Sequence, residues 1–118
     1  MGRGARRAGG APAGSGGPVN TTAFAALGDE TRWSILVSLA REPASASVLA
    51  GELPVSRQAV VKHLDVLRSV GLVESERRGR EVVHRPVGSR LSELGRDLQR
   101  VGTAWENRLD RIRGIAES

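Results

Sequence analysis

Non-polar residues in the segment 53–73 recur at the spacing expected of an amphipathic helix, and this helix should begin at Arg57. The members of this series follow one another at steps of four, three and four: Val60, Leu64, Leu67 and Gly71. Such steps place the side chains along one side of a helix. Ser56 is the expected N-cap, because its side-chain oxygen can accept a backbone N–H at the open end of the helix, whereas Pro54 disfavours helix just before it. Gly71 is the expected stop.

The other side of this helix is short, polar and basic. Side chains in the first turn of a helix-turn-helix recognition helix reach base edges in the DNA major groove, where Arg and Gln can make bidentate contacts with purines. We therefore predict that Arg57 and Gln58 read bases. Lys62 and His63 lie one turn further along and are placed for phosphates. The predicted DNA-binding residues of the helix are Ser56, Arg57, Gln58, Val61, Lys62 and His63. An ordinary amphipathic helix with a solvated polar side is the alternative.

An extended run follows the helix and predicts a β-hairpin, or wing, over residues 72–86. A three-residue turn over 78–80 would set Arg77 opposite Glu81. A turn of residues 78 and 79 alone would set Glu76 opposite Glu81, and we prefer the first form. The predicted DNA contacts of the wing are Arg77, Arg78 and Arg80. Guanidinium groups at the tip can reach phosphates or a narrow minor groove. A solvated charged hairpin is the alternative.

Two further helices are expected upstream. Asp29 is the N-cap of a scaffold helix that ends near Pro43, and its core-facing residues are Ile35, Leu36 and Leu39. Either Ser45 or Ser47 caps the next helix, whose inward residues are Val48, Leu49 and Leu53. This helix and the one from 57 form the pair in which one member crosses the DNA backbone and the other enters the groove. Trp33 lies off the apolar stripe and is either a contact to a partner subunit or a half-buried surface aromatic.

The last segment carries apolar residues at three- and four-residue steps over about seven turns. They are Leu91, Leu94, Leu98, Val101, Trp105, Leu109, Ile112 and Ile115. So long an apolar side on a small domain needs a partner, and pairing with the first helix, residues 22–27, in a symmetric dimer is the economical solution. The predicted dimer interface comprises Phe24, Leu27, Leu94, Leu98, Val101, Trp105, Leu109 and Ile112. A helix packed within its own chain is the alternative, and three glycines weaken its continuity.

The expected fold is therefore mainly α with a small β-hairpin wing. It is a winged helix-turn-helix in which the first and last helices form the dimer interface. A two-fold dimer would set its two recognition helices about 34–36 Å apart, one turn of DNA.

Three segments resemble signature blocks of the ArsR-like family of bacterial winged helix-turn-helix regulators. They are residues 26–36, 56–67 and 71–81, within a match that runs from Phe24 to Glu117. The resemblance implies a homodimer that binds an operator and represses transcription, often of its own gene. Residues 98–110 resemble a metal-independent branch of the family. The positions that depart from the usual pattern are Val61, His84 and Pro86.

Composition sets the outer limits. The first 18 residues contain seven glycines and three arginines, which predicts a disordered tail over residues 1–18 before one domain over residues 19–118. The tail is either a basic arm on DNA or an extension without a role. The net charge is +5, and residues 57–85 hold seven basic and four acidic side chains, which suits a polyanionic partner. There is no apolar run of membrane-spanning length and no secretory signal, so we expect a cytoplasmic protein.

The chain has no cysteine and only two histidines, His63 and His84, so we expect no disulfide, no metal site and no cofactor. Ser56 and His63 are about 10.5 Å apart along one helix, beyond hydrogen-bond reach, and we expect no enzyme. An RNA-binding module lacks aromatic residues in the basic region on which bases could stack. The expected partners are double-stranded operator DNA and a second copy, while an effector is undetermined. A winged helix used only for protein interaction is the alternative function.

Overall fold

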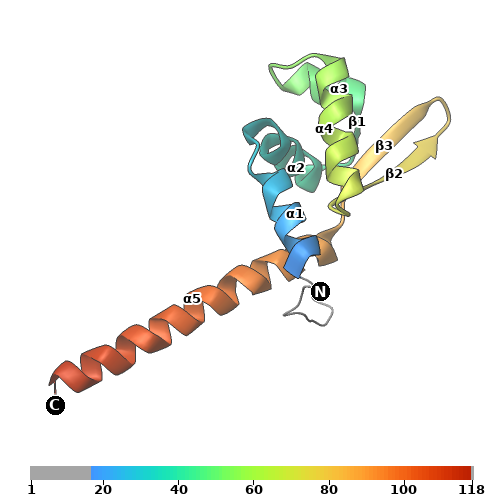
Figure 1. The fold of residues 1–118 in the computed structure, drawn as a ribbon. Helices are drawn as coiled ribbons and strands as arrows, with labels where there is room; N and C mark the ends of the chain where they lie inside the picture. Colours follow the sequence, from blue (N-terminus) through green and yellow to red (C-terminus); the bar gives the residue numbers. More distant parts are fainter. Residues whose placement is uncertain (1–16, 118) are drawn as a thin grey trace. The chain divides into compact units, whose positions relative to one another are not determined.

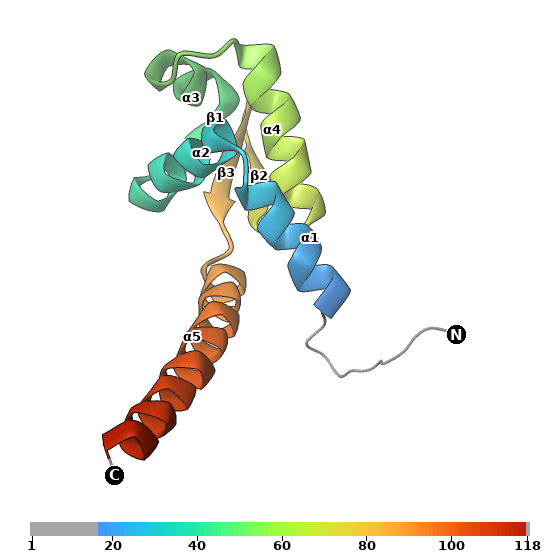
Figure 2. The same ribbon diagram turned by 60° about the vertical axis from the view of Figure 1, so that its left-hand side comes forward.

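The computed structural model describes residues 17–117 and falls into two units, residues 17–88 and the helix that follows, which are described separately. The elements in chain order are α1 (Gly17–Leu27), α2 (Glu30–Arg41), β1 (Ala44–Ser45), α3 (Ala46–Glu52), α4 (Arg57–Ser69), β2 (Val73–Arg78), β3 (Glu81–Pro86) and α5 (Gly88–Glu117) (Figures 1 and 2). The predicted tail lies outside the described residues except for its last two, which begin α1. The first helix thus starts earlier than residue 22, because a proline is tolerated in a first helical turn.

Polar caps start three helices of the first unit. The side chains of Asp29, Ser45 and Ser56 each accept the backbone N–H of the third residue of their helix, at 2.9, 3.2 and 3.1 Å. Each cap stabilises its helix by about 1 kcal/mol. The predictions for Asp29 and Ser56 are confirmed, and of the two serines left open for α3, Ser45 is the cap.

A left-handed glycine ends α4. Gly71 has a φ of 79°, a conformation that costs glycine little. The backbone N–H of Leu72 donates to the carbonyl of Leu67, and that of Gly71 donates to the carbonyl of Arg68, both at 3.0 Å. These two bonds form a Schellman motif, which confirms the predicted stop. Leu72 and Val73 are buried directly after it, so the end of α4 anchors the start of the wing.

The core of the first unit is built from the apolar sides of α2, α3 and α4 and from the base of the wing. Its largest fully buried side chains are Ile35, Leu39, Leu49, Leu64, Leu67, Leu72 and Val60. The predicted stripes of α2 and α4 are confirmed. The prediction for Val48 is wrong, because the seven-residue α3 faces the core through Ala46 and Leu49 and leaves Val48 47% exposed. Leu53 is half-buried, and Trp33 is exposed.

The wing is part of a three-stranded antiparallel sheet in the order β1-β3-β2. β1 has two residues and pairs Ala44 with His84 and Ser45 with Val83. The sequence predicts only the hairpin, because two residues are too few to show the alternation by which a strand is recognised. β1 places the beginning of α3 directly beside the returning strand of the wing.

The turn of the wing differs from both forms considered in the sequence. Arg78 pairs with Glu81, so Gly79 and Arg80 make a two-residue turn, and Arg77 lies opposite Val82. Gly79 has a φ of 63° at the first central position, and two-residue hairpin turns require a positive φ there. The preference for a three-residue turn is therefore wrong, because turn geometry decides the register.

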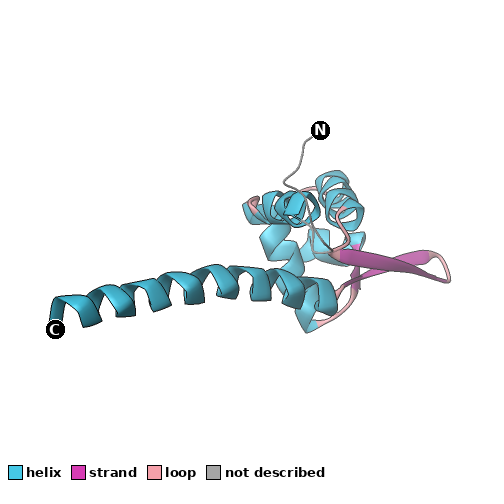
Figure 3. Cartoon of the chain, turned by 60° about the horizontal axis from the view of Figure 1, so that its bottom comes forward, coloured by secondary structure: helices cyan, strands magenta, loops and turns pink. Residues whose placement is uncertain are grey.

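The second unit is one continuous helix, α5, of 30 residues (Figure 3). It is about 45 Å long at 1.5 Å per residue. Five large apolar residues on it are exposed: Leu98, Val101, Trp105, Ile112 and Ile115. Leu94 is buried and Leu109 is half-buried. The other predicted interface residues, Phe24 and Leu27 on α1, are half-buried.

Candidate nucleic-acid interface

The first two turns of α4 present polar side chains to solvent. Arg57, Gln58 and Lys62 are exposed, and Val61 is half-buried between them. In the part of the chain that the structure describes, Gln58 and Lys62 have no hydrogen-bond or ion-pair partner. Ser56 is exposed too, but its side-chain oxygen already serves as the cap of α4. Gln58 and Lys62 can therefore turn toward bases or phosphates without breaking an existing bond.

Arg57 is held by the preceding helix. Its Nε donates to the Ser47 hydroxyl at 3.0 Å, so α3 orients the guanidinium at the start of α4. The two terminal nitrogens are not used in this bond. Ser47 does not cap α3, and its hydroxyl instead orients the Arg57 side chain.

His63 lies beside α2. Its Nδ1 is 3.3 Å from Nη1 of Arg32, and Nε of the same arginine donates to the carbonyl oxygen of Ala26 at 2.7 Å. Arg32 therefore links α1, α2 and α4. The pKa of the half-buried Asp29 is lowered, chiefly by its hydrogen bond from the backbone N–H of Arg32 and further by the nearby guanidinium. Sequence reasoning missed Arg32, because a contact between residues 31 positions apart leaves no local pattern.

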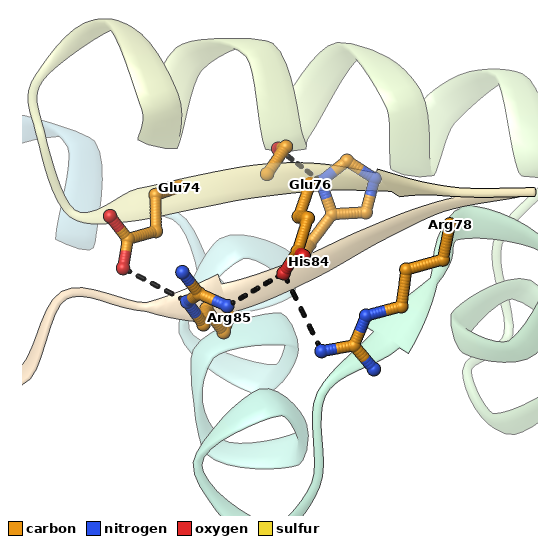
Figure 4. A network of polar contacts seen from close by, with 6 residues as sticks. Glu74, Glu76, Arg78, His84 and Arg85 are labelled. Carbon is orange, nitrogen blue, oxygen red and sulfur yellow. Dashed lines mark hydrogen bonds and ion pairs between the residues drawn. The ribbon is translucent and has the colours of Figure 1, made fainter.

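Ion pairs cover the outer side of the wing. Arg85 donates to Glu74 at 3.0 Å and to Glu76 at 3.1 Å, and it lies between the two carboxylates (Figure 4). The hydrogen bond that Arg85 donates to Glu74, followed by the charge of Glu74 and by the Glu76 contact, raises the pKa of Arg85. Arg78 also reaches Glu76, at 3.5 Å. Exposed pairs of this kind contribute little to stability, so they would cost little to break if a phosphate competed for these arginines.

The three predicted arginines of the wing tip are therefore not equivalent. Arg78 has a carboxylate partner, whereas Arg77 and Arg80 have no ion-pair partner within residues 17–117. All three are exposed. The tip thus offers two unpaired guanidinium groups and one weakly paired group to a polyanion.

A buried histidine joins the inner side of the wing to α4. His84 is 7% exposed, and its Nδ1 shares a hydrogen bond of 2.7 Å with the Ser75 hydroxyl on the neighbouring strand. Nη1 of Arg68, on α4, donates to the same hydroxyl at 3.4 Å, and Nη2 of Arg68 donates to Asp65 at 2.7 Å. Burial, and secondarily the Arg68 charge, lower the pKa of His84. Its side chain is thus a structural link between wing and helix.

Comparison with known proteins identifies the family. Residues 27–76 match a family described as a helix-turn-helix domain. The "HTH-type transcriptional regulator Rv2034" of Mycobacterium tuberculosis is 41% identical over 81 residues, which cover 69% of this chain and 76% of the relative. A solved ArsR-like transcriptional regulator from Rhodococcus sp. RHA1 is 51% identical, with a TM-score of 0.76 over 86% of this chain and 95% of that one.

The chain belongs to the ArsR family of winged helix-turn-helix transcriptional regulators. It is a regulator and not an enzyme. A second solved structure, described as the homodimeric winged helix-turn-helix DNA-binding domain of Mb0332 from Mycobacterium bovis, "a possible ArsR-family transcriptional regulator", is 26% identical, with a TM-score of 0.61 over 73% of this chain and 80% of that one. In a helix-turn-helix domain the second helix of the motif is the one that lies in the DNA major groove, and α4 is the second helix of the motif in this fold.

The described residues contain neither a candidate membrane-spanning helix nor a candidate metal site. None of the helices between residues 17 and 117 is both long and apolar enough to cross a membrane. Over the same stretch, no three or more His, Cys, Asp or Glu side chains are grouped so that they could hold a metal ion.

Proposed function

We propose that this ArsR-family protein is a homodimeric repressor that binds a pseudo-palindromic operator with α4 in the major groove and the wing beside it. The observation that carries the proposal is the pair Gln58 and Lys62, exposed and unpartnered on the first two turns of a capped helix. Gln58 can make a bidentate contact with an adenine edge, and Lys62 can contact a phosphate. His63, at the same level as Lys62, is assigned to the phosphates as well.

The dimer is supported by α5. Its exposed side chains Leu98, Trp105 and Ile112 recur at seven-residue spacing, which is the repeat of a helix seam that packs on another helix. The Mb0332 domain from Mycobacterium bovis, a relative with the same fold, is homodimeric. We assign the predicted residues of α1 and α5 to this interface.

Repression is supported by a relative. The "Transcriptional repressor SmtB homolog" of Synechocystis is 35% identical over 75 residues, which cover 64% of this chain and 57% of the relative. Autoregulation remains part of the same proposal. We also place the protein in the cytoplasm, where bacterial operators are.

We assign the protein to a metal-independent mode of regulation. The sequence has no cysteine and no histidine after residue 84. His63 has a guanidinium 3.3 Å from its Nδ1, and the Nδ1 of His84 is bonded to Ser75, so neither ring presents that nitrogen to a metal ion. On composition, we assign the residues that precede α1 to a tail outside the DNA-binding domain.

The test is a titration of the full-length protein with two duplexes, a random sequence and a sequence selected from genomic fragments that the protein retains. We expect both to bind, with an affinity that falls steeply as salt rises. Replacing Gln58 by Ala should cost about 1–3 kcal/mol on the selected duplex and little on the random one.

Gln99→Ala is the matched control, because Gln99 is the other glutamine of the chain and is exposed on α5. It should leave both affinities unchanged. A wild-type protein that binds neither duplex would be a protein-interaction module, and the proposed function would be wrong.

A further inference from the structure

A groove separates α4 from the wing within the first unit. It has a volume of about 330 Å³ and is walled by the start of α3, one side of α4 and the strand β3 with its turn. The polar side chains that line it and carry the argument are Ser47, Arg57, Arg68, Arg80, Glu81 and His84. Because β1 pairs with β3, the start of α3 lies beside the wing strand that lines the groove.

Two arginines of the groove have no carboxylate partner. Arg68 is already bound at 2.7 Å to Asp65, which also lines the groove, so the charges of this pair offset each other. Arg57 and Arg80 have no ion pair in the stretch from residue 17 to 117, and they come from the α4 wall and the wing wall respectively. The Ser47 hydroxyl holds Nε of Arg57, which leaves the Nη atoms of this guanidinium to donate elsewhere.

The chemistry of the groove matches a phosphodiester. A phosphodiester carries one negative charge and accepts hydrogen bonds, which arginine donates in charge-assisted form. One carboxylate without an ion pair within the described range, that of Glu81, also lines the groove and would repel such an anion. Among the described residues of the groove, two arginines lack a carboxylate partner and only this one acid lacks a cationic partner, so the net charge of these groove side chains is positive.

The position of the groove matches the path of a DNA strand. When a recognition helix lies in the major groove and a wing reaches the neighbouring minor groove, the sugar–phosphate backbone between those grooves passes between helix and wing. We propose that this groove is the seat of that backbone and that Arg57 and Arg80 are its phosphate contacts. The inference rests on the proposed function. It changes the role predicted for Arg57 from base reader to phosphate contact, and it leaves Gln58 to read bases.

The experiment measures the affinity of the full-length protein for the random and selected duplexes over a series of KCl concentrations. Each of the substitutions Arg57→Ala and Arg80→Ala should lower the affinity for the random duplex and for the selected duplex by the same factor. Each should also lower the slope of log affinity against log salt by about 0.9, the value for one phosphate contact on duplex DNA. Arg57→Lys keeps the charge and should restore most of the slope.

Arg41→Ala is the matched control, because Arg41 is exposed at the end of α2 and does not line the groove. It removes the same charge and should change the slope by much less. Removing the acid of the groove gives an opposite test: Glu81→Gln should raise the affinity for random DNA more than Glu42→Gln does, and the gain should shrink as salt rises.

Two results would overturn the inference while the proposed function stands. One is an Arg57→Ala variant that loses affinity only for the selected duplex and keeps its salt slope, because Arg57 would then read bases. The other is a Glu81→Gln variant that behaves as Glu42→Gln does. A wild-type protein that binds no duplex would instead remove the proposed function, and the groove assignment with it.

Discussion

His84 shows how one side chain can couple the wing to the recognition helix. It is buried on β3, shares a hydrogen bond with Ser75 on β2, and through that hydroxyl meets Arg68 of α4. A charged imidazole here would lose its hydration and face the Arg68 guanidinium, so the neutral ring is the form that fits. The orientation of the wing relative to α4 therefore depends on a neutral histidine.

This arrangement predicts a loss of stability in mild acid. The pKa of His84 is lowered from its usual value of 6.5, so as the pH falls below that value the unfolded chain binds a proton before the folded chain does. The contribution of the neutral His84 side chain to the free energy of unfolding is complete above pH 6.5. It is lost as the pH falls toward the lowered pKa. Urea unfolding at a series of pH values should show this fall, and His84→Gln should flatten it. An equal fall in the variant would assign the effect to other groups.

At the scale of elements, α5 is the part that needs a second copy most. Ion pairs of Arg90 with Glu93, Arg100 with Asp97 and Arg113 with Asp110 run along it, and each contributes about 0.2–0.5 kcal/mol. Its interior glycines at positions 95, 102 and 114 cost about 1 kcal/mol each relative to alanine. The stabilisation from these ion pairs is smaller than the destabilisation from the glycines. A helix of this length is therefore best explained by apolar packing on a partner.

A paired substitution tests this explanation. Replacing Leu98 and Trp105 by Gln should give a monomer in sedimentation velocity, because two large apolar side chains of the seam are lost. Operator affinity should fall with it, since one chain then binds one half-site. The control replaces Ser92 and Thr103, exposed on other sides of the helix, by Gln and should stay dimeric. A dimeric Leu98/Trp105 variant would contradict the role of α5.

The elements differ in how far the sequence predicts them. Caps and stripes could be read directly, because Ser56, Gly71 and the apolar side of α4 act through residues a few positions away. The register of the wing could not be predicted, because the amino-acid sequence around Gly79 is compatible with a two-residue turn and with a longer one. β1, and the contacts of Arg57 with Ser47 and of Arg32 with His63, join distant segments and leave no local signal.

At the scale of the whole molecule, the proposed function requires two copies of the chain on one DNA duplex. An ArsR-family fold presents one recognition helix and one wing per chain, and a two-fold dimer repeats them on one side of the DNA. The half-sites of its operator should then lie about one helical turn apart. Within each half-site, we expect Gln58 to discriminate bases, and we expect Lys62 and the groove arginines to set the affinity.

The most direct test is hydroxyl-radical footprinting of the selected operator, with the number of chains per duplex measured on the same complex. The account predicts two equivalent protected patches whose centres are about 10–10.5 base pairs apart, with two chains bound. A single protected patch with one chain per duplex would contradict it, as would retention of DNA without any protected sequence.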